Sequence, residues 1–116
     1  AYNPKVDDPL LIPTTGYAGP DWKMKDLKWA VDQAKNGMIT VLCFHGIPSM
    51  EHPWVSTELK DFEKYMQYLK DEECTVIAMR DLAKYVNPNY RPYKSDPYQP
   101  IRKRVAEMKT KFSKKE

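Results

Sequence analysis

The spacing of apolar residues changes along the chain and predicts a series of helices and strands. Two segments carry apolar residues every three or four positions, as one face of a helix does. The first lies between Asp21 and a stop at Gly37, and the second follows Ser56 or Thr57, either of which could cap it. Their apolar faces consist of Met24, Leu27, Val31 and Ala34, and of Leu59, Phe62, Met66 and Leu69. A short third helix is predicted at residues 81–85.

Two continuous apolar runs, residues 38–44 and 75–79, alternate with these helices. Such runs are typical of strands buried on both faces, and strands that alternate with helices favour an α/β fold with a parallel sheet. Because two strands and three helices leave sheet edges and helix faces uncovered, the pattern predicts that the fold is incomplete by itself. We therefore expect the chain to pack against further segments, a partner or a second copy of itself.

Residues 87–116 form a second region with a different composition. Residues 87–100 are rich in Pro and Tyr, which predicts an extended arm, and residues 101–115 predict a basic helix. The apolar stripe of that helix consists of Ile101, Val105, Met108 and Phe112. A stripe this narrow favours docking on the parent domain or fraying over membrane binding. No platform of aromatic and basic residues on strands accompanies the arm, so nucleic-acid binding is not expected.

The remaining composition is that of an ordinary globular chain of 116 residues. No apolar run approaches the roughly 20 residues that a membrane span needs. Cys43 and Cys74 lie in or next to the two predicted strands and are expected to be small buried residues without a disulfide framework, so they leave the redox compartment open.

His45 is the first candidate for chemistry, because it ends the predicted strand at residues 38–44 and is followed by Gly46. Loops at the carboxyl ends of parallel strands meet in one crevice, where ligands bind. An imidazole there can act as a general acid or base, although a loop histidine held by backbone hydrogen bonds is the alternative. His52 and Trp54 follow in the same loop and either line this crevice or are ordinary exposed residues.

Three segments together resemble the C-terminal third of the polysaccharide deacetylase (NodB homology) domain. They are Pro20-Asp21-Trp22, residues 41–45 and residues 74–82, and the resemblance covers residues 9–86. It implies a partial (β/α) barrel, an acetylated carbohydrate polymer as substrate, and a zinc-like divalent metal in the complete domain. It also implies His45 as general acid, Asp21 as its charge partner, and Trp22 and Cys43 as walls of the acetyl pocket.

The chemistry of these residue types agrees with the implied roles. An imidazole beside a carboxylate can hold and deliver the proton that a leaving amine needs. An indole offers a flat apolar surface to a methyl group or a sugar face, and Trp54 and His52 are further candidates for substrate binding. The plainer alternatives are that Asp21 caps a helix and that Trp22 is a core residue.

The chain departs from the family pattern at the metal site. The family uses an Asp-Asp pair on a strand and a His-x-x-x-His motif, whereas this chain has two histidines seven positions apart and places Asp7-Asp8 in a loop before Pro9. The family's arginine motif is missing, because Arg91-Pro92-Tyr93 lies beyond the last predicted strand. We therefore expect no metal or other cofactor to bind this chain alone.

Three functions follow from the sequence. In the first, residues 1–86 are the C-terminal portion of a deacetylase barrel and carry the acid half of its site, while residues 87–116 form the arm. In the second, the chain is an inert relative in which Trp22, Trp54 and Tyr17 bind carbohydrate. In the third, it is a protein-interaction module. An extracellular or periplasmic location is implied by the resemblance alone.

Overall fold

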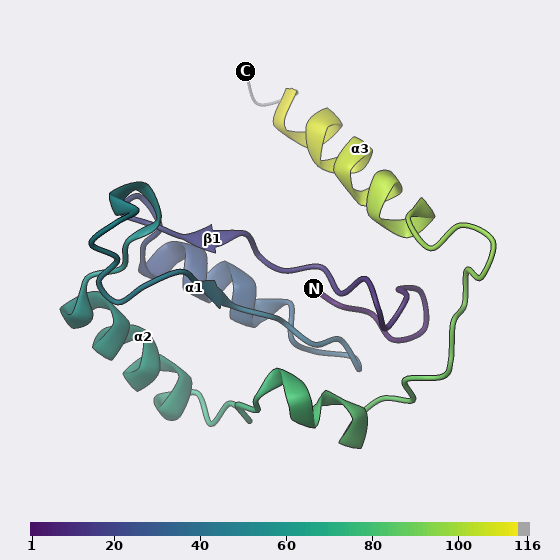
Figure 1. The fold of residues 1–116 in the computed structure, drawn as a ribbon, viewed down its shortest axis with the longest axis horizontal. Coiled ribbons are helices and arrows are strands. Elements are labelled where there is room, and N and C mark those ends of the chain that lie inside the picture. The colour runs from purple at the N-terminus through teal and green to yellow at the C-terminus, as the bar shows by residue number, and fades with distance from the viewer. Residues whose placement is uncertain (114–116) are drawn as a thin grey trace.

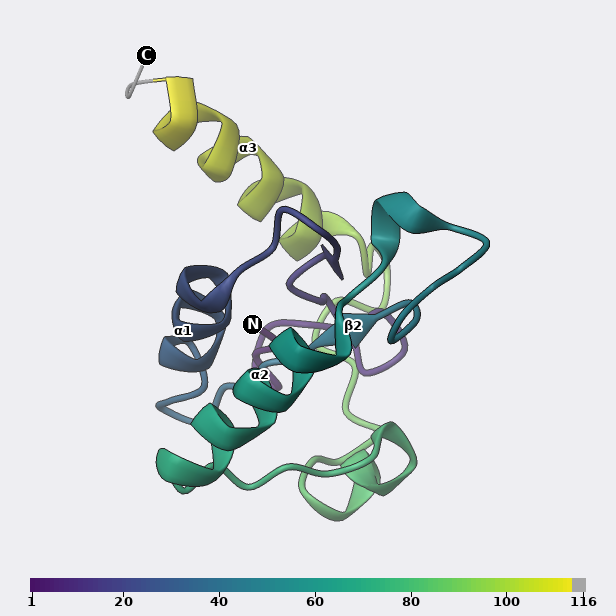
Figure 2. The same cartoon turned by 90° about the vertical axis from the view of Figure 1, so that its left-hand side faces the viewer.

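The computed structural model describes the backbone of residues 1–113 and the side chains of residues 1–16 and 18–110. The body contains a two-stranded sheet with the helices α1 (Met24–Asp32) and α2 (Leu59–Asp71) beside it (Figures 1 and 2). Two 3₁₀ helices, η1 (Pro53–Val55) and η2 (Met79–Lys84), lie in the connections. The helix α3 (Gln99–Ser113) begins near the N-terminal loop and projects away from the body (Figures 1 and 2). The side chains of Tyr17 and Phe112 lie outside the described residues.

The sheet is a parallel pair, but its strands differ from those predicted. β1 (Tyr17–Ala18) pairs with β2 (Cys43–Phe44), in the register Tyr17 to Cys43 and Ala18 to Phe44. The predicted strand at residues 38–44 is thus shorter than expected, and β1 comes from a segment for which no strand was predicted. Ile39 adds an antiparallel bridge to Tyr2.

Residues 75–79 are a correction to the sequence prediction, since they form no strand. None of the backbone groups of residues 75–77 is hydrogen-bonded within the described part of the chain. The side chain of Val76 is 67% exposed there. An apolar, β-branched run forms a strand when a neighbouring strand supplies hydrogen bonds. Within residues 1–113, no strand pairs with this run.

The helices begin and end close to the predicted places, but their caps differ. The Asp26 carboxylate accepts a hydrogen bond from the Lys23 backbone N–H (2.8 Å) at the start of α1, so Asp21 is not the cap. α2 starts after Glu58, and neither Ser56 nor Thr57 caps it. The predicted stop of the first helix is a turn through Asn36 and Gly37, both with positive φ, four residues beyond the helix end.

The core between α1 and α2 is small. Leu27 of α1 and Tyr65 and Leu69 of α2 are buried against one another, and partly buried aromatic and aliphatic residues surround them. Trp22 and Phe44 pack their ring edges there, with the Trp22 centroid 5.1 Å from that of Tyr65 and 5.9 Å from that of Phe44. The core therefore joins both helices to Trp22, four residues after β1, and to Phe44 at the end of β2.

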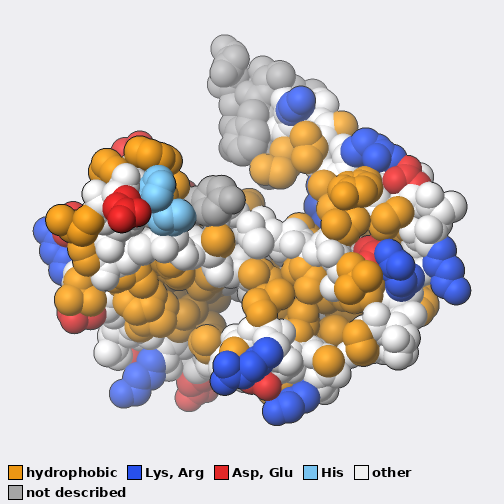
Figure 3. Space-filling model, in the orientation of Figure 1, with side chains coloured by type: hydrophobic (Ala, Val, Ile, Leu, Met, Phe, Trp, Pro, Cys, Tyr) orange, Lys and Arg blue, Asp and Glu red, His pale blue; other side chains and the backbone are white. Residues whose placement is uncertain are grey.

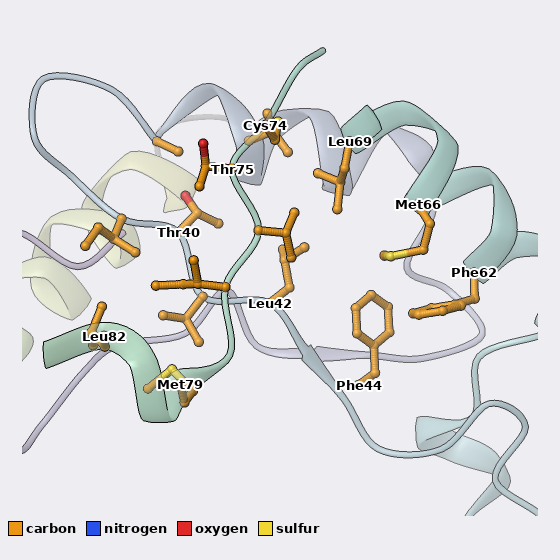
Figure 4. Close-up of a pocket in the computed structure, with 16 residues that line it drawn as sticks. Thr40, Leu42, Phe44, Phe62, Met66, Leu69, Cys74, Thr75, Met79 and Leu82 are labelled. Carbon is orange, nitrogen blue, oxygen red and sulfur yellow. The ribbon is translucent and has the colours of Figure 1, made fainter. Parts of the chain in front are cut away.

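An open apolar groove of about 330 Å³ lies beside this core. Leu42 and Phe44 lie on one side of it with Phe62, Met66 and Leu69 of α2, and Met79 and Leu82 lie on the other (Figure 4). Hydrophobic side chains also gather on the surface of the body in Figure 3. β2 is paired on one edge, with β1, within residues 1–113. The described chain thus leaves both a sheet edge and an apolar face uncovered.

Candidate functional site

The carboxyl ends of β1 and β2 point to one edge of the sheet, since the strands are parallel. Asp21 and Trp22 come shortly after β1, and His45 comes directly after β2. Loops that follow parallel strands converge at such an edge. The structure therefore brings the segments that carry the predicted acid and its predicted partner to the same end of the sheet.

The rings of His45, His52 and Trp54 form a chain of edge contacts at this edge. The ring centroids of His45 and His52 are 4.9 Å apart, and those of His52 and Trp54 are 5.1 Å apart. His45 is exposed, His52 is half-buried and Trp54 is 67% exposed. The histidine side chains are visible together at the molecular surface in Figure 3. This cluster, His45-His52-Trp54, is called the ring cluster below.

The loop that carries the ring cluster is closed on itself by hydrogen bonds. The Thr57 N–H donates to the Gly46 carbonyl (3.0 Å), which brings the two ends of the loop together. Inside it, the Ser49 N–H donates to Ser56 Oγ (2.9 Å), and the His52 N–H donates to Ser49 Oγ (3.3 Å). Short loops of this kind, held by their own polar groups, often carry function. The sequence spacing of seven between the histidines thus becomes a direct ring contact.

Two glycines allow this loop to approach its neighbours closely. A Cβ on Gly19, just after β1, would lie 2.8 Å from the Trp54 carbonyl oxygen. A Cβ on Gly46 would lie 2.7 Å from Ser49 Cβ and 2.9 Å from its Cα. Sequence reasoning did not single out Gly19, because the short strand β1 that precedes it was not predicted.

Asp21 and His45 are not joined by a hydrogen bond or an ion pair in the described part of the chain, and both side chains are exposed. The predicted partnership therefore stays a prediction. Trp22 lies half-buried against Tyr65, whose hydroxyl donates to the Trp22 carbonyl (2.9 Å). Cys43 lies half-buried in β2 with a free thiol. Neither observation assigns a ligand to these two residues.

The aspartate pair that the sequence places in a loop is buried in the structure. Asp7 and Asp8 are each 1% exposed and pair with arginines from the C-terminal region. Among residues 1–113, no group of three or more His, Cys, Asp or Glu side chains is arranged to hold a metal ion. Within that range, no helix is both long and apolar enough to cross a membrane.

Comparisons with protein families, with curated proteins and with solved structures find no match for this chain. The function must therefore be argued from the ring cluster and its surroundings. Two imidazoles can donate or accept protons, and an exposed indole can stack on a flat apolar surface such as a sugar face. Together the two histidines and Trp54 form an exposed polar and aromatic surface.

Proposed function

We propose that the chain is part of a carbohydrate deacetylase domain, in which it contributes the general-acid side of the site and part of the carbohydrate-binding surface. The observation that carries the proposal is the ring cluster at the carboxyl edge of the parallel strands. In this role His45 donates a proton to the leaving nitrogen or oxygen as the bond to the acetyl group breaks. Trp54 stacks on the sugar, and the His52 ring lies between the rings of His45 and Trp54.

The exposure of His45 and Trp54 supports this assignment. A general acid must reach the leaving atom, and the imidazole of His45 is exposed. Trp54 leaves 67% of its side chain open, which exceeds what a core tryptophan would show. Hydrogen bonds from the Ser49 N–H to Ser56 Oγ and from the His52 N–H to Ser49 Oγ hold the loop, so the rings are presented by an ordered segment.

The divalent metal that the resemblance implies does not fit the residues of this chain. The adjacent aspartates are buried against arginines, and the histidines lie in the ring cluster with no third ligand among the described residues. No step of the proposed reaction is therefore routed through a metal held by this chain. Ligands for it would come from the partners that also complete the fold.

The open groove supports the other half of the proposal, which is that the chain works as one portion of a (β/α) barrel. Each large apolar side chain left in water forgoes roughly 1.5 to 3 kcal/mol. Leu42, Phe44, Phe62 and Met66 all line the groove. Further barrel segments or a second copy of the chain would cover them. The same open groove also favours the second candidate function, a protein-interaction module.

Carbohydrate binding provides the first test. Trp54→Ala should abolish the change in tryptophan fluorescence that an N-acetylated chitooligosaccharide produces in the wild-type chain. Met50→Ala is the matched control, because Met50 lies in the same loop and is 86% exposed. Equal responses of the two variants, or no response of the wild type, would contradict the assignment.

Acetate release provides the second test. The chain incubated with zinc and the same oligosaccharide should release no acetate above a buffer blank, because it does not supply a metal site. Release above the blank would show that the chain is a complete enzyme and that the proposed division of the site is wrong. If instead binding is absent while analytical ultracentrifugation shows association, the interaction module becomes the better description.

A further inference from the structure

Two ion pairs connect the C-terminal arm to the N-terminal loop across most of the sequence. Arg91 Nε donates a hydrogen bond to Asp8 Oδ2 (2.8 Å), and Arg91 Nη2 lies 2.7 Å from the same oxygen in an ion pair. Arg104 of α3 donates through Nη2 to Asp7 Oδ2. The partners are separated by 83 and 97 positions, so these contacts are tertiary and cannot form within the arm itself.

Backbone N–H groups of the N-terminal loop also donate hydrogen bonds to both carboxylates. The Asn3 N–H donates to Asp7 Oδ2 (2.8 Å), and the Leu10 N–H donates to Asp8 Oδ1 (2.8 Å). Burial alone would raise the pKa of Asp8, but the Leu10 N–H and the Arg91 guanidinium outweigh it and hold the pKa below its ordinary value. Both carboxylates therefore accept a hydrogen bond from the loop backbone and pair with an arginine of the arm.

The two ion pairs differ in whether all of their buried polar atoms have hydrogen-bond partners. Asp8 uses both carboxylate oxygens, one for Leu10 and one for Arg91. In the other pair, Asp7 Oδ1 and Arg104 Nη1 are buried and have no hydrogen-bond partner among the described residues. Buried polar atoms without partners cost free energy, so the contact at Arg104 is the weaker of the two.

The rest of α3 contributes little apolar burial. Pro100 is buried at its first turn, whereas Val105 and Met108 are 45% and 46% exposed. The C-terminal part of the helix, beyond Arg104, extends away from the body (Figures 1 and 2). A helix of about fifteen residues is marginal in water by itself, so α3 depends on its docked end.

We propose that the ion pairs Asp7–Arg104 and Asp8–Arg91 form a latch that holds the arm, residues 87–113, on the N-terminal loop. When either pair loses its charge, the arm detaches as a unit, while β1, β2, α1 and α2 stay folded. The latched form buries the two carboxylates under the arm. The released form turns the arm into a tethered basic segment and exposes both carboxylates. The proposal does not depend on the enzymatic assignment above.

Hydrogen exchange of the full chain, resolved by mass spectrometry, tests the latch. Arg104→Gln and Arg91→Gln should each raise the exchange rate of the α3 amides by roughly tenfold or more, because one buried aspartate loses its partner. The amides of α1 and α2 should keep their wild-type rates. Arg102→Gln is the matched control: its partner Asp96 is six positions away in the arm, and both side chains are partly exposed. It should change exchange in α3 by less than about threefold.

A double variant separates the latch from general damage. Asp7→Asn combined with Arg104→Gln removes both buried charges at once and should restore part of the α3 protection lost in Arg104→Gln alone. Unchanged protection of α3 in both single arginine variants would overturn the latch. Faster exchange in α1 and α2 as well as in α3 would also overturn it, because the pairs would then hold the whole fold rather than the arm.

Discussion

The hydroxyl of Tyr65 provides the sharpest test of how the core is joined to the site. It donates a hydrogen bond to the Trp22 carbonyl (2.9 Å), and its ring is 3% exposed. Tyr65→Phe removes one oxygen, keeps the ring and leaves no cavity. The bond links α2 to the residue pair that follows β1, so its loss weakens the connection between the core and the carboxyl edge of the sheet.

The expected cost follows from the geometry of this bond. A hydrogen bond of ordinary length contributes about 0.5 to 1.5 kcal/mol net, and the carbonyl left behind is only partly buried, so water can replace the donor. We expect Tyr65→Phe to lower the free energy of unfolding by about 1 kcal/mol. With a slope of about 2 kcal/mol/M in urea, the midpoint falls by about 0.5 M.

Urea titration followed by circular dichroism and tryptophan fluorescence measures this change. Tyr68→Phe is the control on the same helix, because the Tyr68 hydroxyl makes no hydrogen bond among the described residues. Its midpoint should stay within about 0.2 M of the wild type. Equal midpoints for Tyr65→Phe and the wild type, or equal losses in both variants, would refute the reasoning.

Three further perturbations have defined outcomes. Leu27→Ala should lower the free energy of unfolding by about 2 to 5 kcal/mol in the same urea assay, because Leu27 is fully buried. Leu59 is 55% exposed, so Leu59→Ala should change the free energy of unfolding by less than about 1 kcal/mol. Gly19→Ala should displace the loop and shift the Trp54 emission, because its Cβ would meet a backbone oxygen at 2.8 Å; an unshifted spectrum would contradict the close approach. The pKa of Asp8 in the folded chain lies below its ordinary value of 3.8, so the charged carboxylate stabilises the fold above pH 3.8, and this stabilisation is lost as the pH falls through the folded pKa. Asp8→Asn should therefore make the free energy of unfolding less dependent on pH in that acidic range. An unchanged pH dependence would count against the pairing.

The positions of α1 and α2 and the place of His45 after a strand were predicted from the sequence. Apolar residues at helical spacing place Leu27 and Leu69 on buried faces, and the structure confirms both. His45 was predicted at the end of a strand, and it follows β2 directly. These features are local, because a helix and the end of an apolar run depend on the spacing of neighbouring residues.

Strand partners and long-range charge pairs were decided by the tertiary structure alone. The run at residues 75–79 has the composition of a strand but pairs with no strand in residues 1–113, whereas the short β1 forms because Cys43 and Phe44 lie beside it. In the same way, nothing near Asp7-Asp8 indicates that arginines 83 and 97 positions away will neutralise them. Hydrogen bonds between strands and ion pairs between distant segments need two parts of the chain at once, and the pattern of either part alone does not contain the other.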